Sequence, residues 1–168
     1  MMGLQMRQII KLTLVCFALL SSFASAQSGS EQQVIKVLNS FHQAAASADG
    51  DKYFSLLSDD AVFLGTDASE RWNKAQFFDY AKPYFSKGKG WTYHPRDRHV
   101  AFSASGQVAW FDELLDNDNY GECRGSGVLE LIDGEWLISQ YNLTIPVPNE
   151  MAAEMAEQIR KLKGKDKH

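Results

Sequence analysis

The stretch GECRGSGVLELIDGEWLISQYNLT, residues 121–144, decides the fold because it contains two runs of alternating apolar and polar residues. Asp133-Gly134 separates the two runs, and an Asp-Gly pair in this position is a strong signal for a β-hairpin with a two-residue turn. Such a turn fixes the register, so Leu131 should lie opposite Trp136. The runs are therefore predicted to form adjacent antiparallel strands, and the glycines of the first run indicate bulges or a sharp bend.

The residues before this hairpin predict two further strands and, ahead of them, a group of helices. Residues 91–103 and 107–115 alternate in polarity, as half-buried strands do. Apolar side chains at helical spacing predict three helices in the first half of the chain, with a short strand at residues 61–65 between the second and the third. The third helix should start at the cap residue Asn73 and should kink or end near Pro83.

The order of these elements indicates an α+β fold, because helices come first and consecutive strands follow. The helices should pack on the sheet through apolar stripes, which are Val34, Leu38, Phe41 and Ala45 in the first helix and Phe77, Ala81, Tyr84 and Phe85 in the third. A bent antiparallel sheet with helices over its concave face forms a cone, and the open end of a cone is a pocket. A last helix is predicted from Asn149 onward.

Both faces of the hairpin carry apolar side chains. In the register set by the turn, Trp136 and Ile138 share one face with Gln140 and Asn142, while Leu137 belongs to the other face. A sheet face that is exposed to water is normally polar. The second face is therefore expected to contact another subunit or a helix, and we favour a homodimer through this sheet face.

Several motifs in the chain resemble those of SnoaL-like proteins, which belong to the nuclear transport factor 2-like (NTF2-like) superfamily. They are found at residues 65–72 (GTDASERW), 110–113 (WFDE), 121–129 and 133–144. The resemblance covers about residues 31–149 and implies an NTF2-like cone, in which helices cover the concave face of a curved antiparallel sheet. The chain also resembles the association domain of calmodulin-dependent kinases, another NTF2-like module. Because this fold hosts isomerases, cyclases, hydratases and assembly modules, the resemblance bears on fold more than on function.

Residues 1–26 have the pattern of a secretory signal peptide: basic residues, an apolar stretch too short for a comfortable membrane span, and a small-residue cleavage site that ends at Ala26. We therefore expect cleavage after Ala26 and a periplasmic or secreted protein with no membrane attachment. The remaining chain divides into the SnoaL-like domain, residues 27–148, and a C-terminal helix and tail, residues 149–168.

The charge and the cysteine content exclude several classes of function. The chain has a net charge of −4, and removal of the two basic residues Arg7 and Lys11 with the signal peptide changes it to −6. This acidic balance argues against nucleic-acid binding. Only Cys123 remains after cleavage, so no intrachain disulfide is expected. The histidines lack the spacing of a metal site, and no metal or cofactor is predicted.

The candidate pocket residues come from one loop and three predicted strands. The residues expected to bind a ligand are Trp72, Trp110, Asp112, Gln140, Asn142, Arg96 and Arg98. Asp112 and Glu113 must point to opposite faces of their strand, and Asp112 is preferred for the cavity because it shares a face with Trp110. Asp112 and Asp67 are the weak catalytic candidates. The alternatives are an arginine pairing for Asp112, a salt-bridged loop for Asp67, and solvated strand charges for the arginines.

Three functions are compatible with these residues. The preferred one is a binding protein with an aromatic-lined pocket for a small molecule. The second is an acid–base enzyme in which Asp112 or Asp67 is the base and Gln140 or Asn142 donates hydrogen bonds. A rough alignment with ketosteroid isomerase, the best known enzyme of this class, puts Gly65 where that enzyme has its base, which argues against isomerase chemistry. The third is an oligomeric assembly module whose pocket is filled by side chains.

Overall fold

The structure is a computed structural model and describes residues 30–165. The predicted signal peptide and its cleavage site after Ala26 lie outside these residues. Within the described range, no helix is both long and apolar enough to span a membrane.

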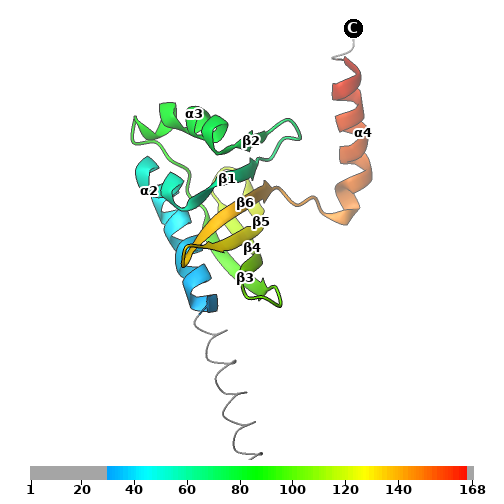
Figure 1. Cartoon of the computed structure of the whole chain (residues 1–168). Helices are drawn as coiled ribbons and strands as arrows, with labels where there is room; N and C mark the ends of the chain where they lie inside the picture. Colours follow the sequence, from blue (N-terminus) through cyan, green and yellow to red (C-terminus); the bar gives the residue numbers. More distant parts are fainter. Residues whose placement is uncertain (1–29, 166–168) are drawn as a thin grey trace, which may run out of the picture.

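The described residues form the predicted α+β arrangement, with helices on one side of a curved sheet (Figure 1). A helix at residues 30–46 comes first. It is followed by α2 (Gly50–Ser55), β1 (Leu57–Leu64), β2 (Arg71–Asn73), α3 (Lys74–Phe85), β3 (His94–Phe102), β4 (Val108–Asn117), β5 (Gly121–Ile132), β6 (Glu135–Thr144) and α4 (Asn149–Lys165). The strand order across the sheet is β2-β1-β6-β5-β4-β3. Strands β1 and β6 pair in parallel, and all other pairs are antiparallel.

The predicted hairpin is confirmed as β5 and β6. Asp133 and Gly134 have φ angles of 51° and 85°, the two positive values that a type I′ turn requires. Leu131 lies opposite Trp136, as expected. The local turn chemistry therefore sets the register of the two central strands of the sheet.

The sheet is larger than the sequence predicts at its β1 edge. Strand β1 starts at Leu57, four residues before the predicted strand at residues 61–65. The short strand β2, which was expected to be a loop, pairs with the end of β1. The capping box that starts α3 is present, with Asn73 and Gln76 bonded reciprocally. Pro83 lies within α3, and the helix continues two residues further to Phe85.

The apolar stripes of the helices bury against the concave face of the sheet. All four predicted residues of the first helix are buried. In α3, Phe77, Ala81 and Phe85 are buried as predicted, whereas Tyr84 is 48% exposed. Trp91, which was expected to start a strand, lies before β3 and packs against the core from the preceding loop.

A β-bulge in β6 changes which side chains face the core. Leu129 lies opposite Ile138 and the next pair is Val128 with Gln140, so Ser139 is an extra residue on β6. Beyond this bulge the alternation is inverted, and Tyr141 is buried where Gln140 was expected.

The facing strand accommodates this bulge through Gly127. A Cβ atom there would collide with the backbone carbonyl of Gln140 and would lie 2.9 Å from the Phe111 ring. Only glycine fits at this position without movement of the neighbouring strand.

A second bulge divides the residues of β3 between the two faces. Arg96 lies opposite Leu114 and His99 lies opposite Asp112, so two residues of β3 face one residue of β4. One of the two is Asp97, whose φ angle is 47°. Although they are two residues apart in one strand, Arg96 and Arg98 lie on opposite faces because of this bulge.

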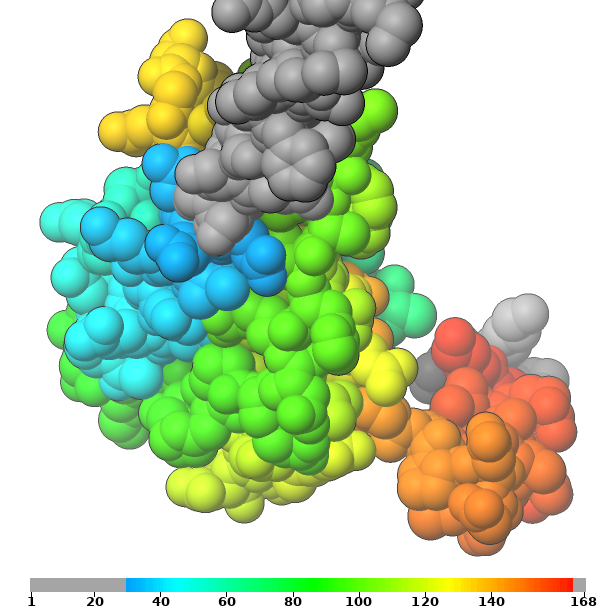
Figure 2. Space-filling model, turned by 90° about the horizontal axis from the view of Figure 1, so that it is seen from below, coloured from blue at the N-terminus to red at the C-terminus, as the bar shows by residue number. Residues whose placement is uncertain are grey.

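The last helix, α4, is confirmed and stands apart from the sheet in both views (Figures 1 and 2). Its apolar residues Met151, Ile159 and Leu162 are exposed. The cone is therefore built by the elements that precede α4.

Candidate functional site

The open end of the cone is a pocket of about 180 Å³ whose walls are mostly aromatic. The aromatic side chains that line it are Phe63, Trp72, Phe77, Tyr80, Trp91, Tyr93 and Tyr120. Phe63 and Phe77 are stacked at 3.9 Å between ring centroids, and Trp72 stacks on Tyr80 at 4.9 Å. These stacked rings come from β1, β2 and α3, so the pocket depends on the packing of that helix against the sheet edge.

The loop between β1 and β2 forms part of the pocket mouth. Thr66 and Glu70 line the mouth, and Glu70 Oε2 accepts a hydrogen bond of 3.0 Å from the backbone N–H of Asp67. Asp67 Oδ1 accepts bonds of 2.8 and 2.5 Å from the backbone N–H and the hydroxyl of Ser69. These bonds from Ser69 lower the pKa of Asp67. Asp67 is therefore an exposed carboxylate that organises the loop, and it does not line the pocket.

A smaller hollow of about 20 Å³ adjoins the pocket on its inner side. We call it the inner chamber. The two hollows share the wall residues Phe63, Trp91, Tyr93 and Leu143. The chamber is also lined by the polar side chains of His42, Tyr53 and Tyr141, which distinguish it from the outer pocket.

His42 connects the inner chamber to a buried carboxylate. Glu113 of β4 is fully buried, and its Oε1 lies 2.6 Å from His42 Nε2. Its Oε2 accepts a 2.6 Å bond from Arg98 Nε of β3, and Arg98 Nη1 donates to Asn39 Oδ1 at 2.7 Å. Burial by itself would raise the pKa of Glu113, but the hydrogen bonds from His42 and Arg98, together with the Arg98 charge, lower this pKa. Glu113 is therefore held as a carboxylate.

Tyr53 of α2 also reaches the inner chamber. It is fully buried, and its hydroxyl has no hydrogen-bond partner among residues 30–165. The Trp91 indole lies edge-on to the Tyr53 ring, with 5.9 Å between the ring centroids. Burial raises the pKa of Tyr53 well above its ordinary value, so the hydroxyl keeps its proton.

The structure separates the predicted site residues into two groups. Trp72 lies in the pocket wall. Trp110, Asp112, Gln140 and Asn142 lie on the convex face of the sheet, and their placement in the cavity is wrong. In β4 the side chains that face the core are Phe111 and Glu113, so Trp110 and Asp112 point to the opposite face from the expected one. For the two residues of β6, the bulge at Ser139 changes the face.

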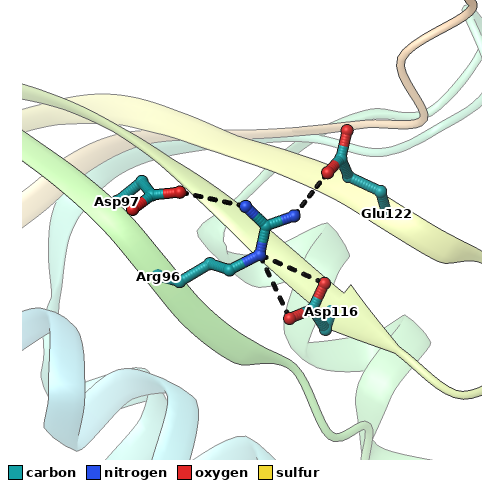
Figure 3. A network of polar contacts seen from close by, with 4 residues as sticks. All are labelled: Arg96, Asp97, Asp116 and Glu122. Atoms are coloured by element: carbon teal, nitrogen blue, oxygen red, sulfur yellow. Dashed lines mark hydrogen bonds and ion pairs between the residues drawn. The ribbon is translucent and has the colours of Figure 1, made fainter.

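The two predicted arginines have different surroundings. Arg98 belongs to the Glu113 cluster and does not line either hollow. Arg96 lies on the convex side, where it forms ion pairs with Asp97, Asp116 and Glu122 (Figure 3). The three carboxylates are more than half exposed to solvent and Arg96 is partly exposed, so this is a surface charge network.

The sequence contained a signal for His42 but none for Glu113. His42 is four residues after Leu38 and lies beside Phe41 in the buried stripe of the first helix, so its side chain could have been expected at the concave face. On β4, both Asp112 and Glu113 have apolar neighbours at i−2 and i+2. Periodicity alone therefore could not identify the buried carboxylate.

Comparison with known proteins assigns this arrangement to a family. The family model described as "SnoaL-like domain" matches residues 34–148. No curated protein matches the chain in sequence. An NTF2-like protein of unknown function from Pseudomonas putida has a similar structure, with a TM-score of 0.63 and 14% identity over 74% of this chain and 92% of the other.

Two further structures have this fold at low sequence identity. A protein from Novosphingobium aromaticivorans, provisionally named a scytalone dehydratase, has a TM-score of 0.61 and 8% identity over 74% of this chain and 89% of its own. A protein from Xanthomonas campestris, provisionally named a calcium/calmodulin-dependent protein kinase II association domain, has a TM-score of 0.52 and 22% identity over 69% and 86%. At these identities the similarity shows the fold alone.

Replacement of the buried carboxylate should destabilise the protein in a pH-dependent way. Glu113→Gln leaves the Arg98 charge buried without its partner, so we expect the free energy of unfolding at neutral pH to fall by about 3–5 kcal/mol. Because the pKa of Glu113 is lowered in the folded state, its contribution is present above the ordinary glutamate pKa and is lost as the pH falls through the lowered value. The difference between wild type and variant should therefore narrow in acid, as measured by urea unfolding.

Asp112→Asn is the matched control, because it changes the adjacent carboxylate on the exposed face of the same strand. Its free energy of unfolding should stay within about 0.5 kcal/mol of the wild type. The role given to the cluster would be contradicted if Glu113→Gln changed the free energy of unfolding only slightly, or by the same amount at every pH.

Proposed function

The chain belongs to the SnoaL-like domain family, and from this premise we propose that it binds a small ring-shaped molecule in the aromatic pocket. The observation that carries the proposal is the open hollow of about 180 Å³ between stacked aromatic rings. Binding sites for small molecules are concave and mostly apolar, with few polar groups that fix the orientation of the ligand. This pocket has that composition, with its polar groups at the mouth and at the inner chamber.

The volume of the pocket limits the size of the ligand. A buried apolar cavity of about 150 Å³ is known to hold a benzene molecule. A pocket of about 180 Å³ therefore suits one substituted ring. Trp72 and Phe77 line the pocket, and their rings supply apolar surface against which such a ligand can pack.

The same observation argues against an assembly module as the main function. In that alternative, the cone interior is filled by side chains and the protein acts through its outer surface. The pocket, together with the unpaired Tyr53 hydroxyl behind it, instead supports an interior that receives a ligand.

Ligand binding should be detectable with p-xylene and p-cresol, two single-ring compounds of matched shape. We expect at least one of them to raise the melting temperature by several degrees at saturating concentration, because a ligand at about 100 times its Kd stabilises by about 2.7 kcal/mol. Binding of the compound should also change the tryptophan fluorescence, since Trp72 and Trp91 line the pocket. The change should be lost in the Trp72→Phe/Trp91→Phe double variant and retained in Trp110→Phe, which alters the convex face. If neither compound changes either signal, the pocket does not bind a ring of this size.

Acid–base catalysis is a second candidate function, and the hydrogen bond of 2.6 Å between His42 and Glu113 favours it. A carboxylate that orients a histidine beside a pocket is a common arrangement for a general base. One protein of this fold bears the provisional name of a dehydratase. The base in this candidate is His42, in place of Asp112 or Asp67.

Exchange of deuterium from the methyl group of labelled acetophenone, followed by NMR, tests the catalytic candidate. If His42 removes a proton from carbon, His42→Gln should slow the exchange by about 10²- to 10⁴-fold, while Asp112→Asn should leave it unchanged. Exchange no faster than in buffer would exclude this chemistry for aryl ketones and leave ligand binding as the function.

We also propose that the protein forms a homodimer through the convex face of the sheet. A line of cross-strand neighbours on this face runs through Val62, Gln140, Val128, Trp110 and Ala101. Four of these five residues are apolar, and Trp110 is 48% exposed in the single chain. An apolar line across the sheet at this position supports contact with a second copy.

A charge placed in this line should separate the subunits. Val128→Glu and Trp110→Glu each bury a carboxylate in the proposed interface, so we expect monomers where the wild type is a dimer in analytical ultracentrifugation. Tyr84→Glu is the control, because Tyr84 is equally exposed but belongs to α3. A wild-type protein that sediments as a monomer at micromolar concentration would refute the dimer.

A further inference from the structure

We propose that the inner chamber binds the hydroxyl group of a phenolic ligand, which donates a hydrogen bond to His42 and accepts one from Tyr53. This inference rests on the proposed ring-binding function and specifies which chemical group the ligand carries and which end enters first. The ring of the ligand occupies the outer pocket, and its oxygen lies in the chamber.

The first observation is the unpaired hydroxyl of Tyr53. The side chain is fully buried and its hydroxyl has no partner among the described residues. Buried polar groups are almost always hydrogen-bonded, because an unpaired one costs about 1–3 kcal/mol. Tyr53 lines the inner chamber, so a ligand atom placed there would provide the missing partner. The protonated hydroxyl of Tyr53 is a donor and needs an acceptor.

The second observation is the orientation of His42. Its Nε2 is bonded to Glu113, which is held as a carboxylate and can only accept a hydrogen bond. The proton of a neutral His42 is therefore assigned to Nε2, and Nδ1 carries the lone pair. His42 lines the same chamber as Tyr53 and supplies an acceptor.

A hydroxyl group satisfies this donor and this acceptor together. Its proton can go to His42 and its oxygen can accept from Tyr53, whereas a ketone oxygen has no proton for His42. A carboxylate ligand would add a negative charge near Glu113, and Arg98, the cation of the cluster, does not line either hollow. The uncharged hydroxyl is the group that matches the chamber.

The size of the chamber supports the same assignment. A hollow of about 20 Å³ exceeds the roughly 10–15 Å³ that one water molecule needs, and it is too small for a ring. It can hold one oxygen atom with its proton. The outer pocket joins it through Phe63, Trp91, Tyr93 and Leu143, so a ring and its hydroxyl group can occupy the two hollows at once.

The test compares p-cresol with p-xylene, in which a methyl group replaces the hydroxyl. p-Xylene is the more hydrophobic compound, so an apolar pocket without a polar subsite should prefer it. We expect the wild type to bind p-cresol at least about tenfold more tightly by isothermal titration calorimetry, because p-xylene leaves Tyr53 and His42 unpaired. Equal or tighter binding of p-xylene would overturn the inference and leave the ring-binding function intact. If neither compound binds, the proposed function fails and the inference fails with it.

Tyr53→Phe separates a ligand-binding role of this hydroxyl from a structural one. The substitution removes an unpaired buried hydroxyl, so the melting temperature of the free protein should stay unchanged or rise. The preference for p-cresol should nevertheless disappear, while p-xylene binding remains. Tyr84→Phe, which removes an exposed hydroxyl from α3 outside both hollows, should keep the preference. A Tyr53→Phe protein that loses stability, or that retains the full preference for p-cresol, would contradict the assignment.

Discussion

The buried carboxylate of Glu113 is the constraint on which the cone depends. It joins three elements, since it is bonded to His42 from the first helix and to Arg98 from β3 while it extends from β4 itself. A buried charge is tolerated only when its partners are in place, so the helix cannot shift along the sheet without breaking these bonds. The helix in turn carries Phe41 and Ala45, two of the side chains that bound the inner chamber.

Glycines in β5 make room for this cluster. A Cβ atom at Gly125 would lie 2.6 Å from the Tyr141 hydroxyl and 3.0 Å from Glu113 Oε1. Both groups occupy the space in front of that backbone, so the missing side chain of Gly125 leaves room for the buried carboxylate and for a tyrosine that lines the inner chamber. The polar side chains of His42, Tyr53 and Tyr141 line the inner chamber and do not line the outer pocket.

The two faces of the sheet consequently differ in what covers them. The concave face is closed by helices and leaves a hollow of about 180 Å³, whereas the convex face presents Val128, Trp110 and their apolar neighbours to the surroundings. The residues that the sequence suggested for ligand binding lie mostly on this second face. Their aromatic and amide character suits an interface as well as a pocket, because both combine apolar area with a few hydrogen-bonding groups.

The fold class, the hairpin register at Asp133-Gly134 and the buried stripe of the first helix could be predicted from the sequence, since each depends on local chemistry or on short-range periodicity. The tertiary structure alone decided which face of β4 is buried, because Asp112 and Glu113 have equivalent neighbours along the chain. It also decided the phase of β6 beyond Ser139, since a bulge is set by pairing with the neighbouring strand. The residues of the candidate site depend on the buried face of β4 and on the bulge in β6. Both are set by contacts between residues that are far apart in the sequence.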